Sequence, residues 1–355
     1  MTGLERRYRR LLLAYPGSYR RRHGDEITTT LLELAEAGGG RPARRQAWQL
    51  LAGGLRQRFR LPARRPLAWL GAVLAAVTLA AFGAAAGSWL ASATQAGLPG
   101  DDSNLALVTL VAGRDGERAV TRSPSPWAGR DAFATARAGA DWTAEPARQR
   151  LQALGWHTEP GTVTTIRPLP DDSPLRDALG PVSLPTTTYR FLAERDGLTI
   201  QVFGSVREGS ADVSVDVWPT ATPLRWPLVI AGLLAGALAG WLVAAALAYR
   251  LRAAGPARRR AGTALFALGL VVLAAPAEAF FSNLARMWRD HGRMGANFGP
   301  EYTVHSALTP GNFYTSGPPW LVLALTVAGA SVLVAAIALT LARRAAGRAQ
   351  VAVAG

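Results

Sequence analysis

Lysine and cysteine are both missing from this 355-residue chain, whose 39 basic residues are all arginine. Without lysine there can be no Walker A lysine, no Schiff base and no lysine general base. Without cysteine there can be no thiolate nucleophile, cysteine-ligated zinc, iron–sulfur cluster or disulfide. Several enzyme classes are therefore excluded, and any exported domain must be stable through its own packing.

Charged residues are also scarce, at 18% of the chain against 49% hydrophobic residues. The run 67–91 contains no charged residue, and at about 1.5 Å per residue it can cross a hydrocarbon core of about 30 Å. Three further apolar runs, 226–249, 262–281 and 320–342, have comparable length. The sequence thus predicts a multi-pass α-helical membrane protein with four transmembrane helices.

The distribution of arginine predicts the orientation of these helices. Residues 1–66 contain 15 arginines and 5 acids, and arginines also crowd 250–261 and 343–355. The positive-inside rule places such segments in the cytoplasm. We therefore expect a plasma-membrane protein with both termini cytoplasmic and with 92–225 and 282–319 outside. Topology accounts for the net charge of +15, so no direct nucleic-acid binding is expected.

The cytoplasmic segment 1–66 is predicted to form a three-helix head. Apolar residues recur at helical spacing from Leu4 to Tyr15 and from Tyr19 to Leu34, with Pro16 and a glycine run as breaks. A third helix is predicted after Pro42, with Trp48 on its apolar face. Apolar stripes this short must pack on one another or on a partner.

The run LLLAYPGSYRRRHGDEITTTLLELAEA resembles an N-terminal helical domain found in membrane proteins of high-GC Gram-positive bacteria. That domain is known as a HAAS-type signalling domain or as a permease prefix. The residues that carry the resemblance, and so the candidates for partner docking, are Tyr15, Pro16, Tyr19, Arg20, Arg21, Gly24, Asp25 and Glu26. In HAAS proteins the implied role is coupling to a PadR-like transcription regulator. In permease-prefix proteins the domain precedes transporter subunits. A basic head can also lie against anionic lipid, and the two roles are compatible.

The exported segment 92–225 is expected to hold a small α+β domain that starts at about Trp127, after a linker around a short strand at 105–111. Asp141 or Thr143 can cap a helix. Strands are predicted at 162–167, 186–194, 198–206 and 211–218, the middle pair joined by an Asp196–Gly197 hairpin turn. This order favours one helix packed on an antiparallel sheet of three or four strands.

The exported segment lacks the spacing that catalysis or metal binding needs. Its one histidine, His157, has no serine and acid arrangement that forms a triad. We expect no catalytic residue, metal or cofactor, and interpret the domain as a binding or interaction module.

Small residues and one acid stand out in the apolar runs. Five glycines at four-residue spacing predict close helix packing, either between spans or with a second copy of the chain: Gly83 and Gly87 in the first span, and Gly232, Gly236 and Gly240 in the second. Glu278 lies near the outer end of the third span, beyond Pro276, as an interfacial or paired acid or as part of a transport pathway.

These features lead to one hypothesis and two alternatives. The hypothesis is a non-enzymatic signalling protein that couples an extracytoplasmic sensing domain to a cytoplasmic partner such as a PadR-like regulator. One alternative is a small transporter or permease-associated subunit, in which Glu278 would matter most. The other is a structural membrane scaffold.

Overall fold

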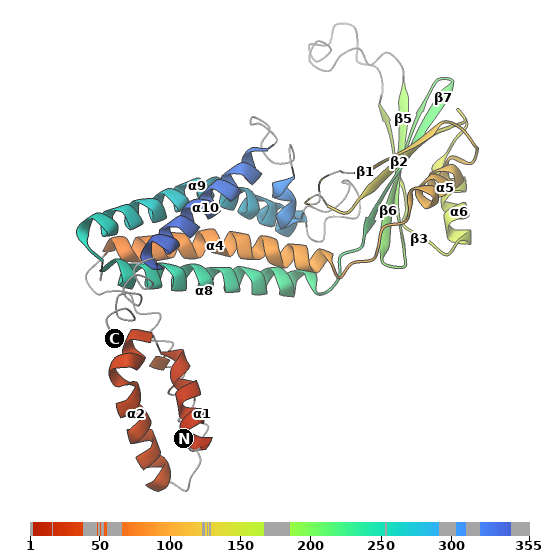
Figure 1. Cartoon of the computed structure of the whole chain (residues 1–355). Coiled ribbons are helices and arrows are strands. Elements are labelled where there is room, and N and C mark those ends of the chain that lie inside the picture. Colours follow the sequence, from red (N-terminus) through yellow and green to blue (C-terminus); the bar gives the residue numbers. More distant parts are fainter. Residues whose placement is uncertain are drawn as a thin grey trace. The chain divides into compact units, whose positions relative to one another are not determined.

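The fold is described from a computed structural model of the whole chain (Figure 1). The structure describes residues 3–15, 17–37, 48, 50, 53–54, 66–122, 125, 127, 129–166, 185–252, 254–290, 303–309 and 320–341. The chain divides into two compact units, of which the first comprises 1–80, 234–274 and 326–355 and the second comprises 81–233 and 275–325.

Two helices of the N-terminal head, in the first unit, are described along their length. Helix α1 spans Gly3–Leu11 and continues into a 3-10 turn, η1, at Leu12–Ala14, before α2 spans Gly17–Ala37. Tyr8 and Leu12 are buried, as the helical spacing predicts. Most of the predicted third helix lies outside the described residues; Trp48, Leu50, Gly53 and Gly54 within it are helical.

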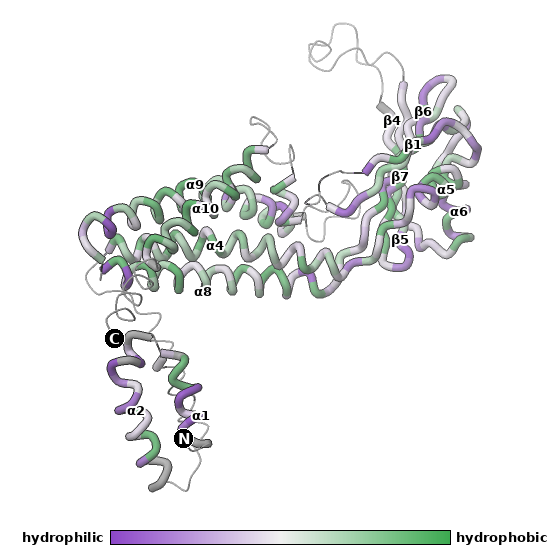
Figure 2. Tube along the Cα trace, viewed as in Figure 1, coloured by the Kyte–Doolittle hydropathy of each residue, from purple (hydrophilic) through white to green (hydrophobic). Residues whose placement is uncertain are grey.

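Among the described residues, four helices are long and apolar enough to cross a membrane, which confirms that part of the sequence prediction. They are α4 (Pro66–Ser92), α8 (Arg225–Arg252), α9 (Pro256–Asp290) and α10 (Leu321–Leu341). Figure 2 shows hydrophobic residues along most of each helix.

Helix α9 extends beyond the predicted third span at both ends. The predicted loop at 250–261 is too long, because α8 continues to Arg252 and α9 already begins at Pro256. At the other end the polar stretch after Phe281 continues the helix to Asp290, with Pro276 inside it. Two side chains in this part of α9 form hydrogen bonds within the helix. Ser282 Oγ donates to Glu278 Oε1 over 2.7 Å, and Arg289 Nε donates to the Ala285 carbonyl over 3.4 Å.

Each unit has its own apolar contacts among these helices. In the first unit, Ala72 and Ala75 of α4 pack with Ala244 and Ala245 of α8 and Leu270 of α9. In the second unit, the remaining parts of α4, α8, α9 and α10 pack around Phe280 together with η2, a 3-10 helix at Val304–Leu308.

The described part of the second unit also contains a seven-stranded antiparallel sheet, where three or four strands were predicted. The strands are β1 (Arg118–Arg122), β2 (Ala132–Ala138), β3 (His157–Thr158), β4 (Thr162–Ile166), β5 (Thr186–Arg195), β6 (Leu198–Arg207) and β7 (Ser210–Pro219). Their order is β1-β2-β7-β6-β5-β3, with β4 also paired to β5. The four strands predicted from the sequence are thus confirmed as β4 to β7.

Helices α5 (Asp101–Ala112) and α6 (Ala144–Ala153) lie together on one side of this sheet (Figure 1). They cover a core that includes Val108, Leu151, Ile200 and Val215. The helix predicted after Thr143 is α6, and Thr143 occupies its N-cap position without a side-chain capping bond. The Asp196–Gly197 turn is confirmed, since both residues have positive φ, at 51° and 75°.

The strand predicted at 105–111 is wrong, because this segment belongs to α5. The apolar run buries Asn104, Val108, Val111 and Ala112, at helical spacing, and Gly113 ends the helix in the left-handed region with φ of 77°. The sheet domain therefore begins with α5 at Asp101, and not near Trp127.

Candidate functional site

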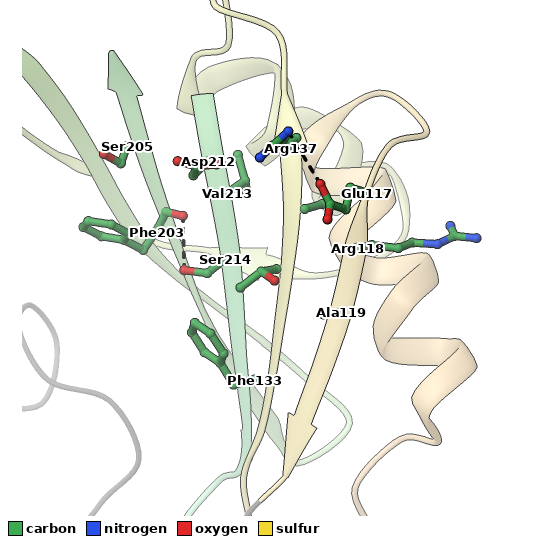
Figure 3. Close-up of a pocket in the computed structure, with 12 residues that line it drawn as sticks. Glu117, Arg118, Ala119, Phe133, Arg137, Phe203, Ser205, Asp212, Val213 and Ser214 are labelled. Atoms are coloured by element: carbon green, nitrogen blue, oxygen red, sulfur yellow. Dashed lines mark hydrogen bonds and ion pairs between the residues drawn. The ribbon is translucent and has the colours of Figure 1, made fainter. Parts of the chain in front are cut away.

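The face of the sheet opposite α5 and α6 carries a hollow of about 460 Å³ over β1, β2, β7 and β6. Figure 3 shows Phe133 of β2 and Phe203 of β6 beside this hollow, with Ser214 of β7 between them. Phe133 is 41% exposed and does not belong to the core under α5 and α6. We refer to this surface as the open face.

Strand register and side-chain alternation build the open face. Along β7, Ala211, Val213, Val215 and Val217 are buried, and the residues between them point the other way. Phe133 pairs with Asp216 across β2 and β7, and Phe203 pairs with Ser214 across β6 and β7. The two phenyl rings therefore flank β7 diagonally, although they lie 70 positions apart in the sequence.

The polar groups around the hollow make few contacts with one another. Arg137 forms an ion pair of 3.5 Å with Glu117, and Asp212 is the cross-strand partner of Arg137. The guanidinium of Arg190 lies 5.6 Å from the centre of the Phe203 ring, within cation–π range. A hollow with aromatic walls and a few polar groups of both charges is suited to binding a small ligand or a peptide segment.

Two carboxylates lie close together at one end of the open face. Burial, followed by the charge of Asp131, raises the pKa of Asp216 to about 7. Burial also raises the pKa of Asp131. Oδ1 of Asp216 is buried and has no hydrogen-bond partner among the described residues. Protonating Asp216 therefore removes an unfavourable buried charge at near-neutral pH.

The sheet connects directly to the ends of α4 and α8. Strand β7 ends at Pro219 and α8 begins at Arg225, so only residues 220–224 intervene. The hydroxyls of Thr94 and Thr222 are 2.9 Å apart, and Arg130 Nη1 donates to the Ser92 carbonyl over 3.3 Å. The chain entering the sheet domain is thus bonded to the chain leaving it.

Segment η2 is also fastened to the end of α4. The backbone N–H of Val304 donates to Ser88 Oγ over 3.1 Å, and His305 Nδ1 lies 3.1 Å from the same oxygen. Burial lowers the pKa of His305 to about 4, so this ring is neutral at pH 7. Of the two histidines in the predicted outer loop, His305 is therefore a buried structural group, and His291 lies outside the described residues.

The structure places the five predicted packing glycines along the contact between α4 and α8. In the second unit, a Cβ added to Gly87 would overlap the Leu228 carbonyl, and one added to Gly232 would overlap the carbonyl of Gly83. In the first unit, a Cβ on Gly236 or Gly240 would overlap the carbonyl of Leu79 or Ala75 respectively. Backbone lies directly on backbone at each position, as in close helix pairs with small residues.

Two of the candidate docking residues of the head, Tyr15 and Tyr19, belong to a row of three rings. The rings of Tyr15 and Tyr19 are stacked with centres 5.2 Å apart, and His23 lies 5.0 Å from Tyr19. Asp25 is exposed and forms an ion pair of 3.7 Å with Arg9.

The other docking candidates take different places on α2 or are not described. Glu26 lies 3.4 Å from the His23 ring nitrogen, and Gly24 accepts a hydrogen bond from Thr28. Nε of Arg20 is buried without a partner among the described residues. Pro16 and the side chain of Arg21 lie outside the described residues.

Glu278 is hydrogen-bonded within its own helix. Its carboxylate accepts the hydrogen bond from Ser282 one turn further along α9. This local bond is consistent with the interpretation of Glu278 as a paired acid near a helix end.

The open face, with Phe133, Phe203 and Asp216, was not predicted from the sequence. The available signal was the alternation in β2, where Phe133, Thr135 and Arg137 separate small alanines. Among the described residues no group of three or more His, Asp or Glu side chains could hold a metal ion. Comparison with protein-family models, curated proteins and solved structures gave no match.

Proposed function

We propose that this chain is a multi-pass membrane protein, without catalytic activity of its own, that couples a binding domain outside the membrane to its helical head in the cytoplasm. The observation that carries the proposal is the backbone-to-backbone contact between α4 and α8, the two helices that lead into and out of the sheet domain. Helices in such contact respond as a pair, because no flexible side chains separate them.

The arginine distribution supports the orientation. Arg250, Arg252 and the run Arg258–Arg260 flank the short turn between α8 and α9, and further arginines precede α4. The sheet domain follows the other end of α4, after about 40 Å of helix. With the positive-inside rule, the head is cytoplasmic and the sheet domain is outside.

The open face is the proposed binding surface of the outer domain. A ligand held between Phe133 and Phe203 would contact β7 directly at Ser214. Because β7 continues into α8 after five residues, a shift of this strand acts on α8 and, through the glycine contacts, on α4. Helix α4 is preceded in the chain by the head, and the affinity of the head for a cytoplasmic regulator of the PadR-like class would then change.

The test is capture of a cytoplasmic partner by the full chain and by a chain without residues 1–60. The deletion is expected to insert normally in the membrane but to lose a defined cytoplasmic protein that the full chain retains. In the full chain, Asp25→Ala with Glu26→Ala should weaken capture, whereas Glu208→Ala, in the exposed β6–β7 turn, should not. Retention of the same protein after deletion would contradict the proposal.

A transport role predicts a different result. Glu278→Gln would then abolish flux of the transported solute, whereas the coupling proposal predicts normal partner capture in this variant. The glutamine oxygen can still accept the hydrogen bond from Ser282.

A further inference from the structure

The first unit contains a second and larger cavity, at the ends of three apolar helices. A crevice of about 760 Å³ lies between the beginning of α4, the end of α8 and the beginning of α9. Its apolar walls include Leu67, Leu247, Leu251 and Phe266. This volume lies within the range of about 300–1,000 Å³ that is usual for small-molecule sites.

Two arginines line the crevice at its α9 side. Arg259 and Arg260 are exposed, and neither forms a salt bridge within the described part of the chain. The segment 250–260 contains five arginines and no acid, so the local charge is uncompensated by sequence neighbours. The arginines also lie in the first turns of α9, where the unpaired N–H groups of the helix favour an anion.

We propose that this crevice binds an anionic phospholipid of the cytoplasmic leaflet. Arg259 and Arg260 contact the headgroup phosphate, and an acyl chain covers Leu247, Leu251 and Phe266. Basic pockets between membrane helices on the cytoplasmic side bind anionic headgroups in this way. Free phosphate would use the arginines alone and leave the apolar walls exposed, so the combination favours a lipid. The inference rests on the proposed membrane insertion and orientation.

The test is native mass spectrometry of the full chain purified from membranes and exchanged into mixed micelles of phosphatidylglycerol and phosphatidylcholine. The wild-type chain is expected to retain phosphatidylglycerol in preference. Arg259→Gln with Arg260→Gln should lower that retention roughly tenfold or more, given the usual contribution of each arginine near an anionic surface. The matched control is Arg250→Gln with Arg252→Gln, which removes the same charge from residues that do not line the crevice.

A second variant separates lipid from free phosphate. Ala267→Trp fills the crevice at an exposed lining position and leaves both arginines in place, so it should also lower phosphatidylglycerol retention. Excess inorganic phosphate should not displace the lipid. Displacement by phosphate together with no effect of Ala267→Trp would show a phosphate site and overturn the proposal.

Two other outcomes overturn the proposal as well. Equal losses in both arginine pairs would show diffuse attraction, and equal retention of the two lipids would show no headgroup recognition. Alkaline carbonate extraction distinguishes failure of the proposed function from failure of this inference. A chain that leaves the membrane under that treatment is not an integral membrane protein. A chain that resists extraction but lacks the lipid preference contradicts only this inference.

Discussion

The ionisation of Asp216 affects the stability of the sheet domain. Its pKa is raised from 3.8 to about 7, first by burial and then by Asp131, so the folded state binds the proton more tightly than the unfolded chain does. Between about pH 4 and pH 7 the unfolded state is ionised while the folded state holds the proton. This residue therefore makes the folded state less stable as pH rises through that range.

Replacing Asp216 by asparagine should remove this pH dependence. At pH 8 we expect Asp216→Asn to be more stable than the wild type by roughly 1–3 kcal/mol, a range reduced for the partial exposure of the side chain, and at pH 4 to differ little. Thermal unfolding of the full chain in detergent at both values of pH measures this. Asp212→Asn, on the same strand and face but exposed, is the control. An equal stability difference at both pH values would contradict the assignment.

A sequence alone could not identify Asp216 as special. Its aspartate occupies an ordinary open-face position in the alternation of β7. The rise in its pKa comes first from burial and then from the charge of Asp131, 85 positions away, and local spacing encodes neither. The packing glycines were recognisable, in contrast, because their four-residue spacing places them on one side of a helix whatever the partner is.

At the scale of elements, the α4–α8 contact depends on the absence of side chains at a few positions. Gly236→Leu would drive a side chain into the Leu79 carbonyl and should destabilise the chain in detergent by roughly 1–3 kcal/mol or more. Ala235→Leu adds a similar side chain one position earlier, where α8 is exposed, and should be nearly neutral. A thermal-shift series in detergent compares them. Similar melting temperatures for the two variants would show that the helices do not need close approach here.

Helix α5 shows how an element can be assigned wrongly from a short apolar run. The β-branched residues near Val108 and Val111 favour a strand locally. The segment is a helix instead, and its buried residues, Asn104, Val108, Val111 and Ala112, recur at helical spacing. Gly113, with its left-handed backbone, and the two aspartates at the start of the helix were the sequence signals that favour a helix.

At the scale of the whole molecule, the four long helices could be predicted because hydropathy and length are local properties. The open face could not, because it depends on strand order. Strand β2 pairs with its sequence neighbour β1 on one side but with the distant strand β7 on the other. The pairing with β7 brings Phe133 onto the same face as Phe203. Nothing in the spacing of these two residues indicates that they flank one strand.

The proposed topology places the sheet domain and the arginine-rich turn between α8 and α9 on opposite sides of a membrane. Because the chain has no cysteine, a single introduced thiol reports its own accessibility without background. Glu208→Cys lies in the exposed β6–β7 turn, and Gly255→Cys lies in the exposed turn before α9.

Labelling of these two variants with a membrane-impermeant maleimide in intact cells is the most direct test. We expect Glu208→Cys to react before permeabilisation and Gly255→Cys to react only after it. Equal labelling of both positions in intact cells would contradict this topology.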